Sequence, residues 1–317
     1  MDLMPGTRPR VSVLIPTFNR ADFLAECLDS ILSDTYPCKE LVIIDDGSSD
    51  GSAEVARQWQ EKNSEKLSGG VTFISRDNRG ISRTLNDLIG LSKGEYFALV
   101  ASDDYLLLDG IRIRVDYLLA HPDKKLVLCD YTVVDKSGMV LYQSGIEDYY
   151  HGDKRCLAHE ELIAYEIIYR WSISGPVYLY RKEAFPLIGG YDEQLIVEDW
   201  DICLKLAARG LVGFVDYTGA AYRLHGDNVV SRPGMERRML ENQIVTALRH
   251  LDSFTGLKRS LLKAYINQAR LDLLRLEGYG GYSYYHLARI LAKLVRWCYR
   301  RKVAATLGSV KKRLPQG

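Results

Sequence analysis

The sequence contains no run of the ~18 consecutive apolar residues that a membrane-spanning helix requires. Positions 1–20 also lack the apolar core of a secretory signal. We therefore expect a cytoplasmic protein with neither a spanning helix nor a leader.

Cysteine is scarce and scattered. The six cysteines form no C-x-x-C pair, which predicts buried thiols rather than disulfides. With 47% hydrophobic and 26% charged residues, the composition excludes collagen-like and mainly disordered chains. A length of 317 residues predicts one large domain with an appendage, or two modest domains.

Acidic residues are absent from positions 278–317, which contain nine Lys and Arg. The rest of the chain therefore has a net charge of −8 (33 basic against 41 acidic residues). An acidic body argues against nucleic-acid binding, and a basic tail predicts a different partner, such as an anionic lipid surface.

Short apolar runs alternate with helical patterns through the first 120 residues. The expected strands are 11–15, 41–44, 71–75 and 96–100, and the expected helices are 22–32, 52–61, 81–91 and 107–120. Four such units with nearly all-apolar strands predict an α/β fold with a mostly parallel central sheet covered by helices.

The pattern changes after residue 125. Short strand-like runs (126–129, 139–142 and 177–180) alternate with helices up to about 232, and only helical patterns follow residue 236. We expect a catalytic domain at 1–232, with halves at about 1–125 and 126–232, and a helical C-terminal region at 233–317.

Four carboxylates follow two of the predicted strands: Asp45, Asp46, Asp103 and Asp104. Because ligands bind at the carboxyl ends of parallel strands, these groups should converge at one edge of the sheet. A divalent metal would offset their mutual repulsion. The alternative is that both segments are turns and helix caps, which favour Asp and Ser for local reasons.

The order of several segments over about residues 11–231 resembles family 2 glycosyltransferases, which are inverting enzymes with the nucleotide-binding GT-A fold. The segments are Val11-Ser-Val-Leu-Ile-Pro-Thr-Phe-Asn-Arg20, Asp45-Asp-Gly-Ser48, Asn78-Arg-Gly80 with Asn86, Gly94-Glu-Tyr96, Ser102-Asp-Asp104, Gly189-Gly-Tyr-Asp-Glu193, Glu198-Asp-Trp-Asp201, and Tyr222-Arg-Leu-His225 with Asn228 and Ser231. Each segment is weak evidence alone, and their common order makes the resemblance strong.

The resemblance implies a nucleotide site. It assigns Pro16, Thr17 and Asn19 to the base pocket, Asp46 to the nucleobase and Asp103 to the ribose. Carboxylates suit these contacts because they accept hydrogen bonds from a base N–H or a ribose hydroxyl.

The same resemblance assigns a metal, Mn²⁺ or Mg²⁺, to Asp104, with His225 as a further ligand. Many relatives read Asp-x-Asp-Asp in this segment, whereas Ala101 stands at the first of those positions here. The metal site is therefore expected to have fewer protein ligands than in those relatives. A structural histidine is the alternative for His225.

Arg76 and Arg83 lie in or just beyond the loop that follows the third strand. A guanidinium there could reach a nucleotide base or phosphate. The alternative is a solvated helix face.

Transfer with inversion needs a carboxylate that deprotonates the acceptor hydroxyl. The resemblance makes Asp199 this base and Glu198 its neighbour, at a helix start that would stabilise negative charge. An ordinary acidic cap is the alternative. Trp171 and Trp200 are the candidates for acceptor binding, although core packing explains such aromatics equally well.

These observations predict an inverting glycosyltransferase that moves a sugar from a nucleotide-diphosphate sugar, UDP-linked by expectation, to a glycan or lipid-linked glycan acceptor. The rivals are a sugar-1-phosphate nucleotidyltransferase and a non-catalytic sugar-binding module. Residues 286–313 predict a basic amphipathic helix that either packs on the catalytic domain or rests on the anionic inner face of the plasma membrane.

Overall fold

The computed structural model describes residues 8–226, 234–277 and 282–313, and in the last range it describes the side chains of 293–308. Asn228, Ser231 and the expected boundary near 232 lie outside the described residues.

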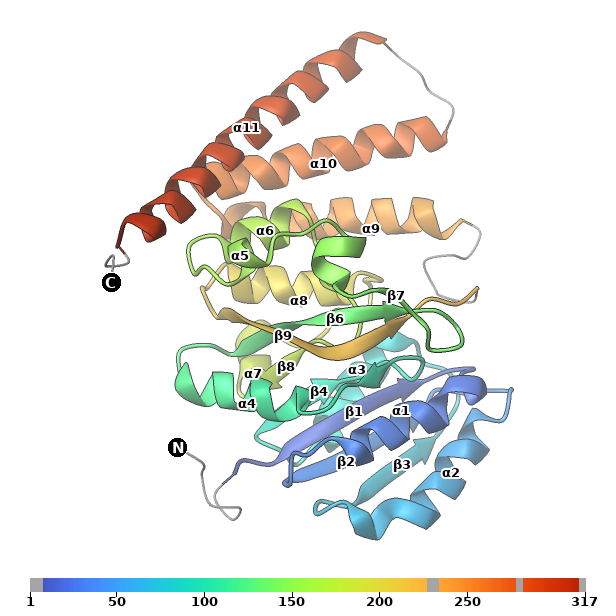
Figure 1. The fold of residues 1–317 in the computed structure, drawn as a ribbon. Helices are drawn as coiled ribbons and strands as arrows, with labels where there is room; N and C mark the ends of the chain where they lie inside the picture. Colours follow the sequence, from blue (N-terminus) through green and yellow to red (C-terminus); the bar gives the residue numbers. More distant parts are fainter. Residues whose placement is uncertain (1–7, 227–233, 278–281, 314–317) are drawn as a thin grey trace.

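A single sheet runs through the catalytic region (Figure 1). Its described strands are β1 (Val11–Thr17), β2 (Lys39–Asp45), β3 (Val71–Ser75), β4 (Tyr96–Leu99), β5 (Tyr105–Leu106), β6 (Leu126–Val134), β7 (Val140–Tyr142), β8 (Leu179–Arg181) and β9 (Val212–Arg223). The order is β3-β2-β1-β4-β8-β6-β9-β5, with β7 beside β6. The four predicted N-terminal strands are confirmed, and they pair in parallel.

Helices follow those strands as predicted. The described α-helices are α1 (Ala21–Ser33), α2 (Ser52–Asn63), α3 (Ile81–Leu91), α4 (Gly110–Ala120), α5 (Lys154–Leu157), α6 (Ile163–Tyr169), α7 (Ala184–Ile188), α8 (Glu198–Ala207), α9 (Met235–Arg249), α10 (Gly256–Leu276) and α11 (Tyr282–Arg313). Three single turns, η2 (Ser64–Lys66), η3 (Gly145–Tyr149) and η5 (Leu251–Ser253), complete the order.

Alternating residues of β1 contribute to two separate cores, because successive side chains of a strand point to opposite faces. Val13 and Ile15 pack with Leu28 of α1 on one face, whereas Leu14 packs with Leu88 of α3 on the other. Both faces are buried, which explains why these strands are apolar throughout.

The pairing of β5 with β9 was not predicted. Tyr105 lies opposite Ala221, and β9 also runs parallel to β6. This arrangement brings the end of β9 to the turn after β4. There the Arg223 N–H donates to Asp104, although 119 positions separate the two residues.

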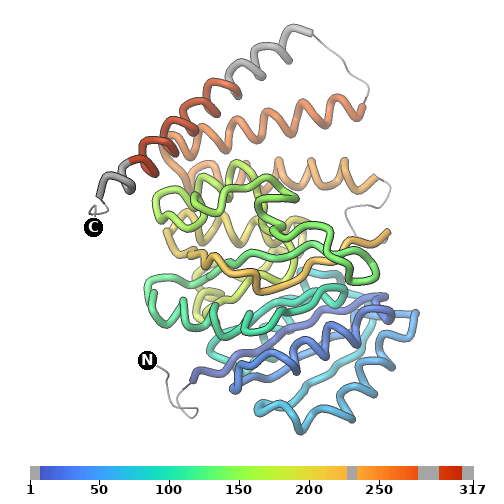
Figure 2. The backbone as a smooth tube through the Cα atoms, in the orientation of Figure 1, coloured from blue at the N-terminus to red at the C-terminus, as the bar shows by residue number. Residues whose placement is uncertain are grey.

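The last three helices stack beyond the sheet, and α10 packs on α6, α9 and α11 (Figures 1 and 2). The predicted absence of strands after residue 236 is confirmed for the described part of this region. Within the described ranges, none of the helices has the length and hydropathy needed to cross a bilayer.

Candidate active site

A cavity of about 690 Å³ opens at the carboxyl ends of β1, β2 and β4. Residues from distant parts of the chain line it: Pro16, Thr17, Phe18, Arg20, Asp46, Asn78, Gly80, Ile81, Thr84, Ala101, Ser102, Asp103, Tyr150, Arg170, Trp171, Ile173, Ser174, Ile196, Val197, Glu198, Asp199, Trp200, Met235, Met239, Gln243 and Tyr265. Of the four carboxylates predicted to converge, Asp46 and Asp103 line the cavity, whereas Asp45 and Asp104 are buried outside its lining. The Glu198-Asp199 pair faces the same space.

Asn19 organises the loop after β1. Its backbone has a φ of +55°, a left-handed conformation that Asn adopts more easily than most residues. The Asn19 N–H donates to Ser48 Oγ at 2.8 Å, and its Oδ1 accepts from the Ser49 N–H at 2.9 Å. Asn19 thus joins the loops after β1 and β2, while Pro16 and Thr17 line the cavity itself.

Asp46 lies in the cavity wall with its carboxylate held by the loop after β3. It accepts hydrogen bonds from the Gly80 N–H at 2.9 Å, from the Arg79 N–H at 3.1 Å and from Arg76 Nε at 3.1 Å. Gly47 allows the two loops to approach, because its φ is +85° and a Cβ there would lie 2.8 Å from Asn78 N. Asp46 is therefore fixed in position before any ligand arrives.

The two candidate arginines differ in environment. Arg76 bonds Asp46, Asp87 and Thr84, and its side chain is 14% exposed, so it supports Asp46 from behind the wall. Arg83 is exposed on α3 and pairs with Asp87 and Glu193. Neither side chain lines the cavity. The position of Arg83 agrees with a solvated helix face, which was the alternative to a nucleotide contact.

Asp103 is the carboxylate of its pair that faces the cavity. Its Oδ2 accepts from Arg20 Nε at 2.7 Å and lies 3.0 Å from His225 Nε2. Burial opposes ionisation, yet the His225 hydrogen bond and the charge of Arg20 together lower the pKa of Asp103 below its ordinary value. Asp103 is therefore an anion at neutral pH.

Asp104, predicted as the metal ligand, points away from the cavity. It is 2% exposed and its Oδ1 accepts from the Arg223 N–H at 2.8 Å. Burial and the adjacent Asp103 charge raise the pKa of Asp104 well above its ordinary value. Asp104 thus anchors β9 through the Arg223 N–H instead of facing the cavity.

The described residues do not contain a cluster of three or more His, Cys, Asp or Glu side chains able to enclose a metal. Asp103 lines the cavity, and His225 Nε2 lies 3.0 Å from its Oδ2, although the His225 side chain is 2% exposed and is not part of the cavity lining. A carboxylate and an imidazole are donors that could hold a divalent ion, and the imidazole would favour Mn²⁺ over Mg²⁺.

Glu198 and Asp199 begin α8 and open into the cavity. Burial and the Asp199 charge raise the pKa of Glu198 to about 8. Burial also raises the pKa of Asp199 to about 6, although the Trp200 N–H, 2.7 Å from Asp199 Oδ1, partly offsets this. The pair therefore shares one proton near neutral pH, with Asp199 the ionised member.

The two tryptophans have different surroundings. Trp171 has a φ of +44° and reaches the cavity with its side chain partly exposed. Trp200 is fully buried; its Nε1 donates to the Ile167 carbonyl at 3.1 Å and its ring packs on Tyr265. Trp200 supports the cavity wall and has no exposed ring face for an acceptor, so the contact expected for it does not fit this geometry.

Sequence reasoning missed part of the wall. Met235, Met239 and Gln243 of α9 line the cavity from beyond the expected domain boundary, and Arg170 lines it beside Trp171. No motif marks these positions. Arg20 lies in the loop after β1, three positions beyond Thr17, and its place in that loop was a usable signal.

The comparisons with known proteins agree with this geometry. Residues 12–157 match the family model described as Glycosyl transferase family 2. An uncharacterised glycosyltransferase of Rickettsia typhi is 26% identical over 272 residues, which is 85% of this chain and 76% of that protein. The chondroitin synthase of Pasteurella multocida is 29% identical over 224 residues, which is 69% of this chain but 21% of that protein.

Two solved structures share the fold. The mannosyltransferase PcManGT from Pyrobaculum calidifontis, in complex with GDP-Man and Mn²⁺, has a TM-score of 0.62 at 20% identity and covers 98% of this chain and 89% of its own. TarS of S. aureus, in complex with UDP-GlcNAc, has a TM-score of 0.62 at 19% identity over 81% of this chain and 72% of its own.

The family match, the relatives and the fold together define a glycosyltransferase with the GT-A fold. Within this class the chain is similar to glycosyltransferase family 2, whose model matches residues 12–157, the segment that includes β1 to β7 with the Asp46 and Asp103 loops.

Proposed function

We propose that the protein is an inverting glycosyltransferase that uses a nucleotide-diphosphate sugar, with UDP as the nucleotide, and transfers the sugar to a hydroxyl of a glycan or lipid-linked glycan. The observation that carries the proposal is that one cavity contains Asp46 and Asp103 at its strand-end side and the Glu198-Asp199 pair at its α8 side. A donor and an acceptor can thus meet in the same space.

The strand-end side would bind the nucleotide. Pro16 and Thr17 line the cavity and would form the base pocket. Asp46, fixed by Arg76 and the Gly80 N–H, would accept from a base N–H. Pre-organisation of Asp46 lowers the ordering cost of binding.

Asp103 and His225 would hold Mn²⁺ or Mg²⁺. The metal would offset the negative charge that develops on the departing diphosphate. Arg20 lines the cavity beside Asp103, with its Nε 2.7 Å from Asp103 Oδ2, and would contact a diphosphate oxygen. The Asp103 carboxylate, rather than that of Asp104, is the ligand in this proposal.

Asp199 would act as the general base. Its raised pKa of about 6 leaves it ionised at neutral pH yet more basic than an ordinary aspartate. It would take the proton of the acceptor hydroxyl as the oxygen attacks the anomeric carbon and the bond to the diphosphate breaks. Protonated Glu198 would donate a hydrogen bond to the acceptor or to the loop, and Trp171 offers a ring for sugar stacking.

The two rival functions predict different chemistry. A nucleotidyltransferase would form a nucleotide sugar from a sugar phosphate, and a binding module would have no use for a carboxylate with a raised pKa in the cavity. The family match favours glycosyl transfer over both.

A screen of nucleotide sugars by thermal stabilisation, with Mn²⁺ and with chelator, tests the donor and the metal together. We expect one nucleotide to raise Tm with Mn²⁺, and a smaller rise with chelator. Equal stabilisation under both conditions would refute the metal role, and release of pyrophosphate from a nucleoside triphosphate would favour the nucleotidyltransferase.

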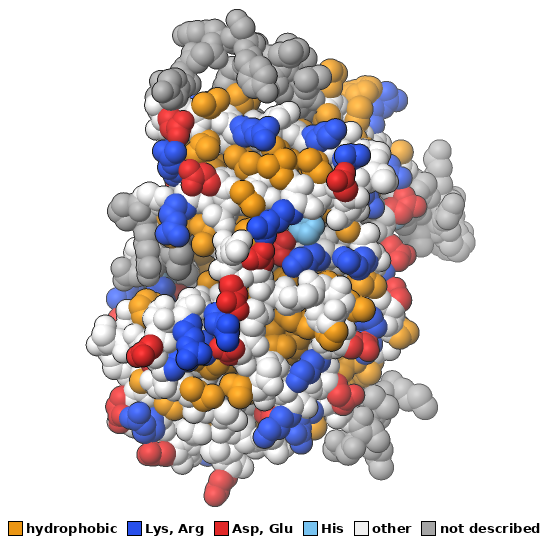
Figure 3. Space-filling view, turned by 180° about the vertical axis from the view of Figure 1, so that it is seen from behind, with side chains coloured by type: hydrophobic (Ala, Val, Ile, Leu, Met, Phe, Trp, Pro, Cys, Tyr) orange, Lys and Arg blue, Asp and Glu red, His pale blue; other side chains and the backbone are white. Residues whose placement is uncertain are grey.

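We also propose that α11 contacts the anionic inner face of the plasma membrane. Val295, Tyr299 and Val303 pack inward, whereas Leu294 and Trp297 are 55% and 54% exposed on the outer side. Lys293, Arg300 and Arg301 lie exposed near them. Figure 3 shows further apolar and basic side chains intermixed over the part of the molecule that the C-terminal helices occupy.

A further inference from the structure

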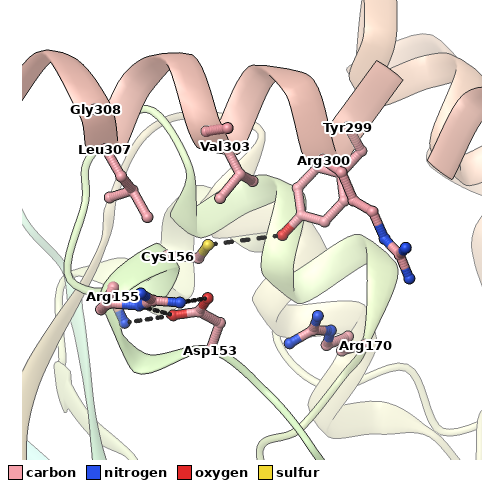
Figure 4. Close-up of a pocket in the computed structure, with 10 residues that line it drawn as sticks. Asp153, Arg155, Cys156, Arg170, Tyr299, Arg300, Val303, Leu307 and Gly308 are labelled. Carbon is pink, nitrogen blue, oxygen red and sulfur yellow. Dashed lines mark hydrogen bonds and ion pairs between the residues drawn. The ribbon is translucent and has the colours of Figure 1, made fainter. Parts of the chain in front are cut away.

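A second pocket, of about 410 Å³, lies between α5, the end of α6 and α11, outside the catalytic cavity (Figure 4). Three arginines line it, one from each element or its end: Arg155, Arg170 and Arg300. Asp153 is the carboxylate among the described lining residues. We call this site the basic pocket.

The walls of the basic pocket are built on buried groups. Glu166 is 1% exposed; its Oε2 accepts from the Tyr299 hydroxyl at 2.7 Å, and its Oε1 accepts from the Asp153 N–H at 2.9 Å. Arg170 Nη1 lies 3.4 Å from the same Oε1, and the Arg170 guanidinium stacks over the Tyr169 ring. The positions of α5, α6 and α11 are therefore locked together at this point.

The basic pocket keeps a net positive charge, because its three arginines face two acids: Asp153, which pairs with Arg155, and Glu166, which pairs with Arg170. Asp153 is engaged by Arg155 in a two-bond pair, and Arg155 remains 75% exposed. No acid of the described residues forms an ion pair with Arg300, which is exposed. Figure 4 shows Arg170 and Arg300 on one side of the pocket and Arg155 on the other. Guanidinium groups arranged in this way suit an oxyanion, which they can bind with paired hydrogen bonds.

Arg170 connects the basic pocket to the catalytic cavity, because its side chain lines both. We propose that the basic pocket binds the phosphate group of the acceptor, while the acceptor hydroxyl reaches Asp199 in the adjoining cavity. The acceptor role of the basic pocket rests on the proposed glycosyl transfer. The ability of the pocket to bind phosphate does not depend on that proposal. The proposal makes the acceptor a phosphate-bearing molecule, and it assigns selection of that molecule to Arg155, Arg170 and Arg300.

Calorimetric titration of the full chain with inorganic phosphate, in chelator, tests the site. We expect phosphate to bind the wild type and to bind Arg155→Gln/Arg300→Gln at least tenfold more weakly. The matched control is Arg57→Gln/Arg112→Gln, which removes the same charge from exposed positions on α2 and α4 and should bind like the wild type. No binding to the wild type, or equal loss in the control, would overturn the proposal.

Two further experiments separate the phosphate site from the catalytic proposal and from a membrane contact. Asp199→Asn should bind phosphate normally, so a failure of the catalytic proposal leaves this result unchanged. Co-sedimentation with phosphatidylglycerol vesicles distinguishes an acceptor phosphate from a lipid surface. If Arg155→Gln/Arg300→Gln lost vesicle binding but kept phosphate affinity, the pocket would be a membrane contact and the proposal would be wrong.

Discussion

His225 Nε2 lies 3.0 Å from Asp103 Oδ2, although 122 positions separate the two residues. The pairing of β5 with β9 makes this contact, because it brings the end of β9 beside the loop that contains Asp103. The contact distinguishes Asp103 from Asp104, which faces the Arg223 N–H in the protein interior.

Asp103→Asn should therefore weaken Mn²⁺-dependent binding of the nucleoside diphosphate by at least ~tenfold, since a charge-assisted contact contributes about 1.5–3 kcal/mol. Asp104→Asn should keep the metal dependence, because the amide oxygen can still accept from Arg223. Calorimetry with Mn²⁺ and with chelator measures both. The reverse pattern would restore Asp104 as the ligand.

Arg76→Gln should weaken nucleoside binding even in chelator, because it removes a donor that holds Asp46 in the cavity wall. The loss of a hydrogen bond to a charged group predicts about 1.5–3 kcal/mol. Arg83→Gln is the control; its side chain is 47% exposed and makes no contact with Asp46. Similar affinities for both variants would show that Arg76 does not position Asp46.

Glu198 should make stability depend on pH. Its pKa in the folded protein is about 8, above the ordinary value of 4.5, so the folded state binds more protons than the unfolded state between these limits. The stability that this group contributes is present below about pH 4.5 and falls as pH rises towards 8.

Glu198→Gln removes that titration. We expect its Tm to exceed that of the wild type increasingly from pH 5 to pH 8, by about 2–4 °C for each ~1 kcal/mol gained. Glu193→Gln, at an exposed position in the preceding segment, provides the control. Parallel Tm profiles for wild type and Glu198→Gln would contradict the raised pKa.

The outer face of α11 gives a sharper membrane test than truncation, because Tyr299 bonds buried Glu166 and removal of the helix would expose it. Leu294→Ser/Trp297→Ser should reduce binding to anionic vesicles at least ~tenfold, since each apolar side chain contributes roughly 1.5–3 kcal/mol on burial. Leu274→Ser/Leu276→Ser removes two exposed leucines from α10 as a control. Unchanged binding by the α11 variant would exclude this face.

Much of the donor half could be predicted from the sequence. Apolar strands that alternate with helical periodicity established the parallel arrangement of β1 to β4, and the carboxylates after β2 and β4 indicated where a ligand binds. These features depend on local pattern. They need no knowledge of long-range pairing.

The rest depends on contacts between distant segments. Periodicity does not reveal that β9 pairs with β5, or that Asp103 rather than its neighbour faces the cavity. The contribution of α9 to the cavity wall was also missed, because the residues involved, such as Met239 and Gln243, belong to no motif. Trp200 shows the same difficulty, since a buried ring and a sugar-binding ring have the same sequence signature.

The most direct test of the account is the turnover of Asp199→Asn with its donor affinity measured in parallel. A general base contributes about 10²–10⁴-fold, so we expect kcat to fall by that factor while donor affinity stays within about twofold of the wild type. The wild-type rate should rise with pH through about 6, the pKa of Asp199. Asp192→Asn, in the loop before α8, should turn over normally. Near-normal turnover of Asp199→Asn would contradict the assignment of Asp199 as the base.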